Sequence, residues 1–160
     1  MGREIADSIL LVSEVIHSML KEKIRGMAIK LDVEKAYDRV VWQFLLCVLE
    51  KFRFPPQWIA CIKFCISSVN LSLLVNGSVC GFFPATNGLR QSNPLSPSVF
   101  IIMAKVLGRL IQKKHLQGEW KGIRIHDQLN VITHSQFADD TVVFGEASFA
   151  ESKCILETLD

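Results

Sequence analysis

In residues 130–144, NVITHSQFADDTVVF, two β-rich runs lie on either side of Asp139-Asp140. Runs of this composition around a short polar pair are typical of a β-hairpin. Residues 27–33, MAIKLDV, alternate apolar and polar side chains with a period of two, which predicts a strand with one buried face. If this strand and the hairpin pair in one sheet, we expect Asp32, Asp139 and Asp140 to converge at one edge.

Three converging carboxylates suit a divalent cation. Mg²⁺ prefers hard oxygen ligands and keeps open positions for water and phosphate. Two such ions can activate an attacking hydroxyl and stabilise a leaving oxygen. The residues alone leave two other interpretations open. Asp139-Asp140 could be ordinary turn residues, and Asp32 could cap a helix that follows the strand.

The remaining elements follow from periodicity and turn residues. An amphipathic helix is predicted over 4–24 and is expected to stop at Gly26. Its expected buried face consists of Ile5, Ile9, Val12, Ile16, Met19 and Leu20. Paired strands with helices between them indicate an α+β fold with helices on one face of the sheet.

Five further elements complete the predicted order. They are a helix over 34–52 that ends before Pro55-Pro56, a helix from there to about 67, a hairpin turning at Asn76-Gly77, a helix from Ser96-Pro97 to about 115, and a final helix over 147–160.

Composition excludes several classes of protein. The 160 residues are 49% hydrophobic with a mean hydropathy of +0.28, which excludes a disordered or collagen-like chain and fits one domain. The net charge of +2 neither requires nor excludes a nucleic-acid partner.

The five cysteines include no C-x-x-C pair, and Cys61 and Cys65 are expected in the core. No signal peptide or membrane span is recognised, so we expect an intracellular protein, nuclear or cytoplasmic and not secreted.

Three motifs resemble those of one enzyme family. Residues 30–40, KLDVEKAYDRV, with Trp42 after them, closely resemble the first catalytic motif of non-LTR (LINE-type) retrotransposon reverse transcriptases, most closely those of plants. Residues 88–97, GLRQSNPLSP, resemble the second motif, G-[LV]-R-Q-G-D-P-L-S-P, and 137–140 match the F-A-D-D box. The segment upstream, GREIADSILL over 2–11 with Glu14 and His17, also resembles the family.

The resemblance implies a polymerase palm, a mixed or antiparallel sheet backed by helices, with partial fingers and no thumb. The palm would span 27–160, after a pre-palm helix in 1–26. The implied activity is that of an RNA-directed DNA polymerase, which joins deoxynucleotides to a primer 3′-hydroxyl on an RNA template. Asp32 and Asp139 would ligate two Mg²⁺ ions, with Mn²⁺ able to replace them, and Asp140 would complete the metal site.

The resemblance also implies a nucleotide-binding set. Tyr37 matches the aromatic residue that lies under the incoming sugar and excludes a ribose 2′-hydroxyl. Gln91 matches a residue that contacts the incoming nucleotide and the template base pair, and Arg90 would meet a phosphate. The residues alone leave open that Tyr37 is a core aromatic and that Arg90 is a surface charge.

The chain departs from the family at Ser92, where the family has Gly, and at Asn93, where it has Asp. Ser adds a Cβ where backbone could approach a nucleotide, and Asn removes a charge. From the resemblance we also expect a basic fingers segment before Gly2 and a thumb after the F-A-D-D hairpin, and residues 1–160 contain neither. The small basic groups of the chain, Lys21 to Arg25 and Lys113-Lys114, look too few to grip a duplex.

These departures predict an inactive remnant of a retrotransposon gene, with fingers and thumb segments missing or supplied in trans. The alternatives are an active palm and a non-catalytic interaction or nucleic-acid-binding module that reuses the palm. Nucleotide cyclases share carboxylate hairpins of this kind, but the 90–97 block argues against them.

Overall fold

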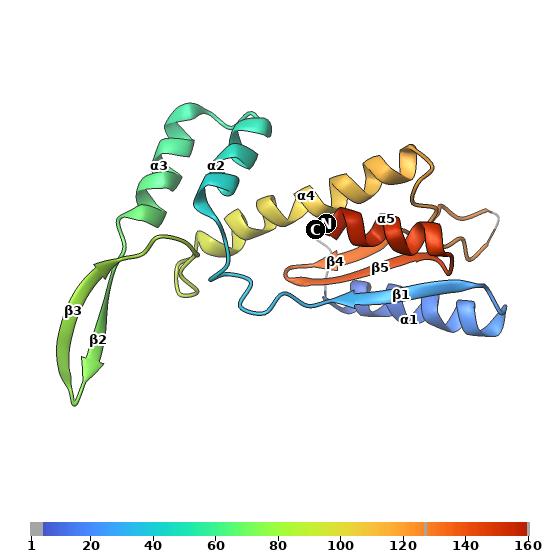
Figure 1. Ribbon diagram of the computed structural model, residues 1–160, viewed down its shortest axis with the longest axis horizontal. Coiled ribbons are helices and arrows are strands. Elements are labelled where there is room, and N and C mark those ends of the chain that lie inside the picture. Colours follow the sequence, from blue (N-terminus) through green and yellow to red (C-terminus); the bar gives the residue numbers. More distant parts are fainter. Residues whose placement is uncertain (1–4, 127, 160) are drawn as a thin grey trace. The chain divides into compact units, whose positions relative to one another are not determined.

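The computed structural model describes residues 5–126 and 128–159, which belong to two compact units (Figure 1). One unit comprises Met1–Val33 with Ala104–Asp160, and the other comprises Glu34–Met103. The elements in chain order are α1 (Ile5–Lys21), β1 (Gly26–Leu31), α2 (Trp42–Lys51), α3 (Pro56–Ser67), β2 (Asn70–Val75), β3 (Ser78–Pro84), α4 (Ser96–Leu116), β4 (His134–Phe137), β5 (Asp140–Glu146) and α5 (Phe149–Leu159). Within the described part of the chain, no helix is both long enough and apolar enough to span a bilayer.

The first unit is built on a three-stranded sheet of order β1-β5-β4. Both pairings are antiparallel. The β1–β5 ladder runs from Gly26↔Glu146 to Leu31↔Thr141, and the β4–β5 ladder ends at Phe137↔Asp140. The α+β fold and the hairpin around Asp139-Asp140 predicted from the sequence are therefore confirmed, with the sheet entirely antiparallel.

Side chains of β5 enter two cores, one on each face of this sheet. Val143 packs with Ile111 of α4, Trp120 and Ile155 of α5. Phe144, the next residue, packs with Val15 of α1 and with Ile123. Since successive strand residues point to opposite faces, helices cover both faces (Figure 1). The expectation that helices lie on one face only is wrong, because β5 carries apolar side chains on both of its faces.

Helix α1 buries a face that only partly coincides with the predicted one, since Val12 and Met19 pack against the core as expected. Val15 is fully buried, with Leu11, Val12 and Met19 packed around it. Three of the residues expected in the core are exposed, Ile9, Ile16 and Leu20. The helix carries apolar residues on two adjacent stripes, and contact with Ile123 and Phe144 selects between them.

Of the two predicted ends of α1, only the second lies within the described residues. The predicted start at Glu4 lies outside the described residues. At the other end α1 stops at Lys21, and Lys23 adopts a left-handed φ of 53°. Gly26 therefore opens β1 rather than ending the helix. A Cβ at Gly26 would meet the side-chain tips of Ile123 and Met19.

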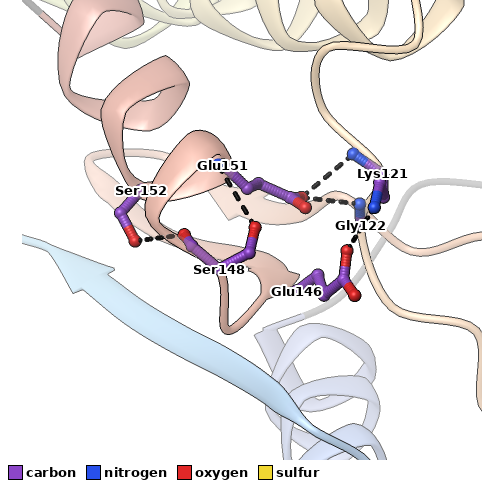
Figure 2. A network of polar contacts seen from close by, with 6 residues as sticks. All are labelled: Lys121, Gly122, Glu146, Ser148, Glu151 and Ser152. Carbon is purple, nitrogen blue, oxygen red and sulfur yellow. Dashed lines mark hydrogen bonds and ion pairs between the residues drawn. The ribbon is translucent and has the colours of Figure 1, made fainter.

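A buried glutamate joins α5 to the segment before β4 (Figure 2). Glu151 is 2% exposed, and its Oε1 accepts hydrogen bonds from the backbone N–H groups of Lys121 (3.0 Å) and Gly122 (2.9 Å). Ser148 caps α5 by accepting a hydrogen bond from the Glu151 backbone N–H. The Lys121 ammonium pairs with Glu146 of β5, and this hydrogen bond lowers the pKa of the Glu146 carboxyl. These contacts fix the 118–122 connection against the sheet.

In the second unit, the helix predicted over 34–52 begins only at Trp42. Residues 35–39 form turns, and Lys35 has a φ of 53°. The carbonyls of Tyr37 and Val40 accept hydrogen bonds from backbone N–H groups near residue 88, which a continuous helix would not allow. The prediction for 34–41 is therefore wrong.

The other elements of this unit begin where the turn residues predicted. Pro56 is the first residue of α3, and Ser96 is the first residue of α4, which runs to Leu116. Asn76 (φ 49°) and Gly77 (φ 81°) connect β2 to β3, which confirms the hairpin. The final helix is also confirmed as α5, with Asp160 outside the described residues.

The cysteines expected in the core of α3 lie on its other face. Cys61 and Cys65 are exposed, whereas Ile62 and Ile66 are buried. The prediction for these two cysteines is wrong, because the neighbouring residues Ile62 and Ile66 occupy the buried side of the helix.

Candidate active site

The three candidate metal ligands lie at one end of the three-stranded sheet. Asp32 is the first residue after β1, and Asp140 is the first residue of β5. Leu31 is paired with Thr141, so the next step along both strands brings Asp32 opposite Asp140. Asp139 sits in the turn that precedes Asp140. All three residues are exposed.

The turn that carries Asp139 is tight. Phe137 and Asp140 form the last pair of the β4–β5 ladder, so Ala138 and Asp139 are the whole loop. Ala138 has a φ of 52°, in the left-handed region that residues with a Cβ adopt at an energetic cost. Two-residue hairpin loops need positive φ at their first position because this matches the twist of the strands. The turn therefore holds Asp139 at the tip of the hairpin.

A lysine connects the carboxylates electrostatically. The Nζ of Lys30 lies 3.1 Å from Oδ1 of Asp140. The hydrogen bond to Asp140 and its charge raise the pKa of the Lys30 ammonium, and the charges of Asp32 and Asp139 raise it further. All three carboxylates therefore act on one cation. The sequence offered a signal for Lys30, since it lies two residues before Asp32 and so on the same face of β1, but no role was assigned to it.

The carboxylates as placed do not form a ready metal cage. Among residues 5–126 and 128–159, no three His, Cys, Asp or Glu side chains lie close enough together to hold an ion. Their oxygens are the ligand type that Mg²⁺ prefers, and their exposure leaves space for water and phosphate. In this structure the cation next to Asp140 is the Lys30 ammonium.

In the second unit, the first and second motifs are joined through their backbones. The N–H groups of Gly88 and Leu89 donate to the carbonyls of Val40 (2.8 Å) and Tyr37 (2.9 Å). The indole Nε1–H of Trp42 donates to the Gly88 carbonyl at 2.7 Å. Gly88 has a φ of 85°, and a Cβ there would lie 3.1 Å from the backbone oxygen of Asp38. Glycine is required here by both conformation and space.

Two candidate nucleotide-binding residues line a cavity of about 550 Å³ in this unit. Arg90 and Gln91 are exposed residues of the segment between Gly88 and α4, and both line the cavity together with Asp38 and Ser96. Tyr37 is not among the lining residues. Its half-buried ring stacks on Phe100 of α4, with centroids 4.8 Å apart and planes 12° apart. This contact gives Tyr37 a packing role in its own unit.

The two positions that depart from the family pattern lie in the same cavity wall. Ser92 is not among the described residues with positive φ, so its backbone does not require glycine. Asn93 accepts a hydrogen bond from the Leu95 N–H through its Oδ1 at 2.9 Å, next to the start of α4. Asn93 therefore closes the turn before α4 through the side-chain oxygen that an Asp would also offer, without the charge.

Comparisons with known proteins agree on one family. The family model described as reverse transcriptase (RNA-dependent DNA polymerase) matches residues 2–160. The chain is 26% identical over 145 residues to an uncharacterized 149 kDa protein of transposon TX1 from Xenopus laevis, covering 91% of this chain and 11% of that protein. It is 30% identical over 148 residues to a retrovirus-related Pol polyprotein from type-1 retrotransposable element R2 of Nasonia vitripennis, covering 89% of this chain and 14% of that protein. The chain thus spans a small part of the length of these relatives.

The fold is similar to that of a solved structure. Apo telomerase from Candida tropicalis, truncated from its C-terminal domain, matches with a TM-score of 0.67 at 14% identity. The match covers 99% of this chain and 32% of that chain. At this identity the likeness establishes the fold, which is that of a reverse transcriptase palm.

Proposed function

Because the chain belongs to the reverse transcriptase (RNA-dependent DNA polymerase) family, we propose that Asp32, Asp139 and Asp140 form the catalytic end of an RNA-directed DNA polymerase palm. The reaction is transfer of a deoxynucleotide to a primer 3′-hydroxyl, with an RNA template, a DNA primer and deoxynucleoside triphosphates as substrates. The observation that supports the proposal is the strand register, which places Asp32 opposite Asp140 at one end of the sheet with Asp139 in the adjoining turn.

The carboxylates fit a divalent cation. They supply oxygen ligands from two neighbouring strands, and their combined charge already favours a cation beside Asp140. When bound, two Mg²⁺ ions would activate the attacking hydroxyl and neutralise the charge of the leaving pyrophosphate. Asp32 and Asp139 would hold the ions, and Asp140 would complete the set once it exchanges its contact with Lys30.

The residues of the second unit would position the nucleotide. We assign Arg90 to a phosphate and Gln91 to the base pair, because both are exposed in the wall of one cavity. Tyr37 would lie under the sugar, with its ring orientation fixed by Phe100. A bulky ring in that place would leave no volume for a 2′-hydroxyl and would select deoxynucleotides by exclusion.

Primer extension on an RNA template, with Mg²⁺ and deoxynucleotides, tests this function. Asp139→Asn removes one proposed ligand, and Glu34→Gln is a matched control that also removes one exposed carboxylate charge. Extension by the wild type and the control, lost in Asp139→Asn, is the expected result if this chain is active by itself. Equal extension by both variants would overturn the assignment.

Metal binding tests the same residues without catalysis. Mn²⁺ titration followed by its electron paramagnetic resonance signal should show binding to the wild type and to Glu34→Gln. We expect the affinity of Asp139→Asn to fall by about tenfold or more, as is typical when a metal site loses a supporting carboxylate. Mn²⁺ binding without extension would support the inactivity predicted from the sequence, which stays a prediction. Equal Mn²⁺ affinity in all three proteins would refute the metal site itself.

A further inference from the structure

Lys30 and Asp140 come from neighbouring strands and meet on one face of the sheet. Lys30 of β1 is paired with Val142 of β5, and Asp140 lies two residues before Val142. Side chains two residues apart on a strand share a face, so Asp140 lies diagonally across from Lys30. Diagonal neighbours in an antiparallel pair are within reach of a long side chain. The register of the sheet therefore brings this ammonium to Asp140.

The contact with Lys30 occupies one of the three proposed metal ligands. The Nζ of Lys30 lies 3.1 Å from Oδ1 of Asp140, which is a hydrogen-bonding distance. No ion pair joins Asp32 or Asp139 to a cation within residues 5–126 and 128–159. A single ammonium thus serves a group of three carboxylates, and it is bound to the one that begins β5.

The ion pair between Lys30 and Asp140 can separate without disturbing the fold. Its two side chains are 65% and 63% exposed, so water reaches both charges. Exposed ion pairs are weak, and a lysine ammonium on its four-carbon stem is free to adopt other positions. A cation that binds Asp140 more strongly than Lys30 does can therefore replace the ammonium there.

We propose that Lys30 is an internal competitor for the metal site, because its ammonium holds Asp140 until a divalent cation displaces it. This role rests on the proposed function, since it concerns the same three carboxylates. It accounts for one feature of the described residues, that no three acidic side chains lie close enough together to hold an ion while Asp140 contacts Lys30. Mg²⁺ prefers the same kind of oxygen that the ammonium contacts.

Removal of the competitor should raise the metal affinity of the full 160-residue chain. Lys30→Met keeps an unbranched side chain and removes the ammonium. Mn²⁺ titration followed by electron paramagnetic resonance should give an affinity about two- to fivefold higher than that of the wild type, the range that one exposed ion pair accounts for. Lys30→Arg keeps a cation beside Asp140, so its affinity should stay close to that of the wild type.

Lys121→Met is the matched control for the loss of one positive charge. Lys121 is 66% exposed and pairs with Glu146, at the opposite end of the β1–β5 ladder. At the usual rise per strand residue, the two ends of this ladder are roughly 17 Å apart. Salt screens exposed charges beyond about 8 Å at physiological ionic strength, so we expect no change in Mn²⁺ affinity.

Asp140→Asn separates competition at one carboxylate from a general effect of charge. Without the charge of Asp140, the ammonium no longer competes for that ligand. Lys30→Met should therefore raise the affinity of the wild type and leave the affinity of Asp140→Asn nearly unchanged.

Nuclear magnetic resonance follows the lysine itself in the unaltered chain. The ε-carbon signal of Lys30, assigned by its loss in Lys30→Arg, should shift as Mg²⁺ is added and with the same midpoint as metal binding. The corresponding signal of Lys121 should stay in place, because its partner Glu146 is not one of the proposed ligands.

Failure of Lys30 as a competitor is distinguishable from failure of the metal site. Equal Mn²⁺ affinities of the wild type and Lys30→Met overturn the role of Lys30, and they leave the proposed function standing if Asp139→Asn still weakens binding. An equal rise in Lys121→Met, or an undiminished rise in the Asp140→Asn background, also overturns that role. Absence of Mn²⁺ binding from both the wild type and Lys30→Met refutes the role and the metal site together.

Discussion

The indole Nε1–H of Trp42 donates a 2.7 Å hydrogen bond to the carbonyl oxygen of Gly88, and so joins the first residue of α2 to a turn 46 positions along the chain. Trp42→Phe keeps an aromatic ring and leaves that carbonyl without its donor. We expect the free energy of unfolding to fall by about 1 to 2 kcal/mol, measured by urea denaturation followed by circular dichroism.

Trp58→Phe is the control for this substitution. Trp58 stacks on Phe54 with ring centroids 4.6 Å apart, and phenylalanine retains that contact. A loss of stability as large as that of Trp42→Phe would mean that ring size, rather than the hydrogen bond, accounts for the effect.

Gly88 should tolerate alanine far less than Gly118 does. Both have positive φ, 85° and 76°, so each pays the left-handed penalty of about 1 to 2 kcal/mol. A Cβ at Gly88 also presses on the Asp38 backbone at 3.1 Å, whereas nothing lies within 4 Å of one at Gly118. Thermal unfolding should therefore show a clearly lower melting temperature for Gly88→Ala. Equal melting temperatures would contradict the close approach of the two motifs.

Asn93→Asp should stabilise the chain. The side-chain oxygen already accepts the Leu95 N–H near the N-terminus of α4, where a negative charge gains about 0.3 to 1 kcal/mol. The gain should be present at neutral pH and disappear in acid, once the new carboxyl is protonated. Urea denaturation at the two pH values measures it. A pH-independent effect would rule out the helix-terminus explanation.

Glu151 should be replaceable by glutamine but not by alanine. Its Oε1 satisfies the N–H groups of Lys121 and Gly122, while its buried Oε2 has no hydrogen-bond partner among the described residues. Glutamine keeps the acceptor, so we expect little change. Alanine leaves two N–H groups unsatisfied, at about 1 to 3 kcal/mol each. Calorimetric unfolding of both variants checks this, and equal losses would show that packing volume matters more than hydrogen bonding.

Local signals predicted much of the fold. The Asn76-Gly77 turn, the start of α3 at Pro56 and the alternation along β1 each depend on a few neighbouring residues, and each is found as expected. Family motifs then gave the location of the carboxylates at the edge of the sheet, which the register of β1, β4 and β5 supports.

The predictions are wrong where contacts between distant parts of the chain determine the local structure. Residues 34–41 have helical composition, but the N–H groups of Gly88 and Leu89 donate to the carbonyls of Val40 and Tyr37. Either of two stripes on α1 could be buried, and only the positions of Ile123 and Phe144 choose between them. Lys30 was overlooked because its importance depends on Asp140, more than a hundred residues later.

Because β5 packs into a core on each of its faces, its residues differ in how freely they can be substituted. Val143 lies in one core and Val142 and Phe144 in the other. Residues 141–145 are buried or half-buried, whereas Asp140, the first residue of the strand, is exposed. Folding therefore constrains the body of the strand and leaves its acidic end free. Under the proposed function, activity could therefore be lost by substitution of the carboxylates while the sheet persisted.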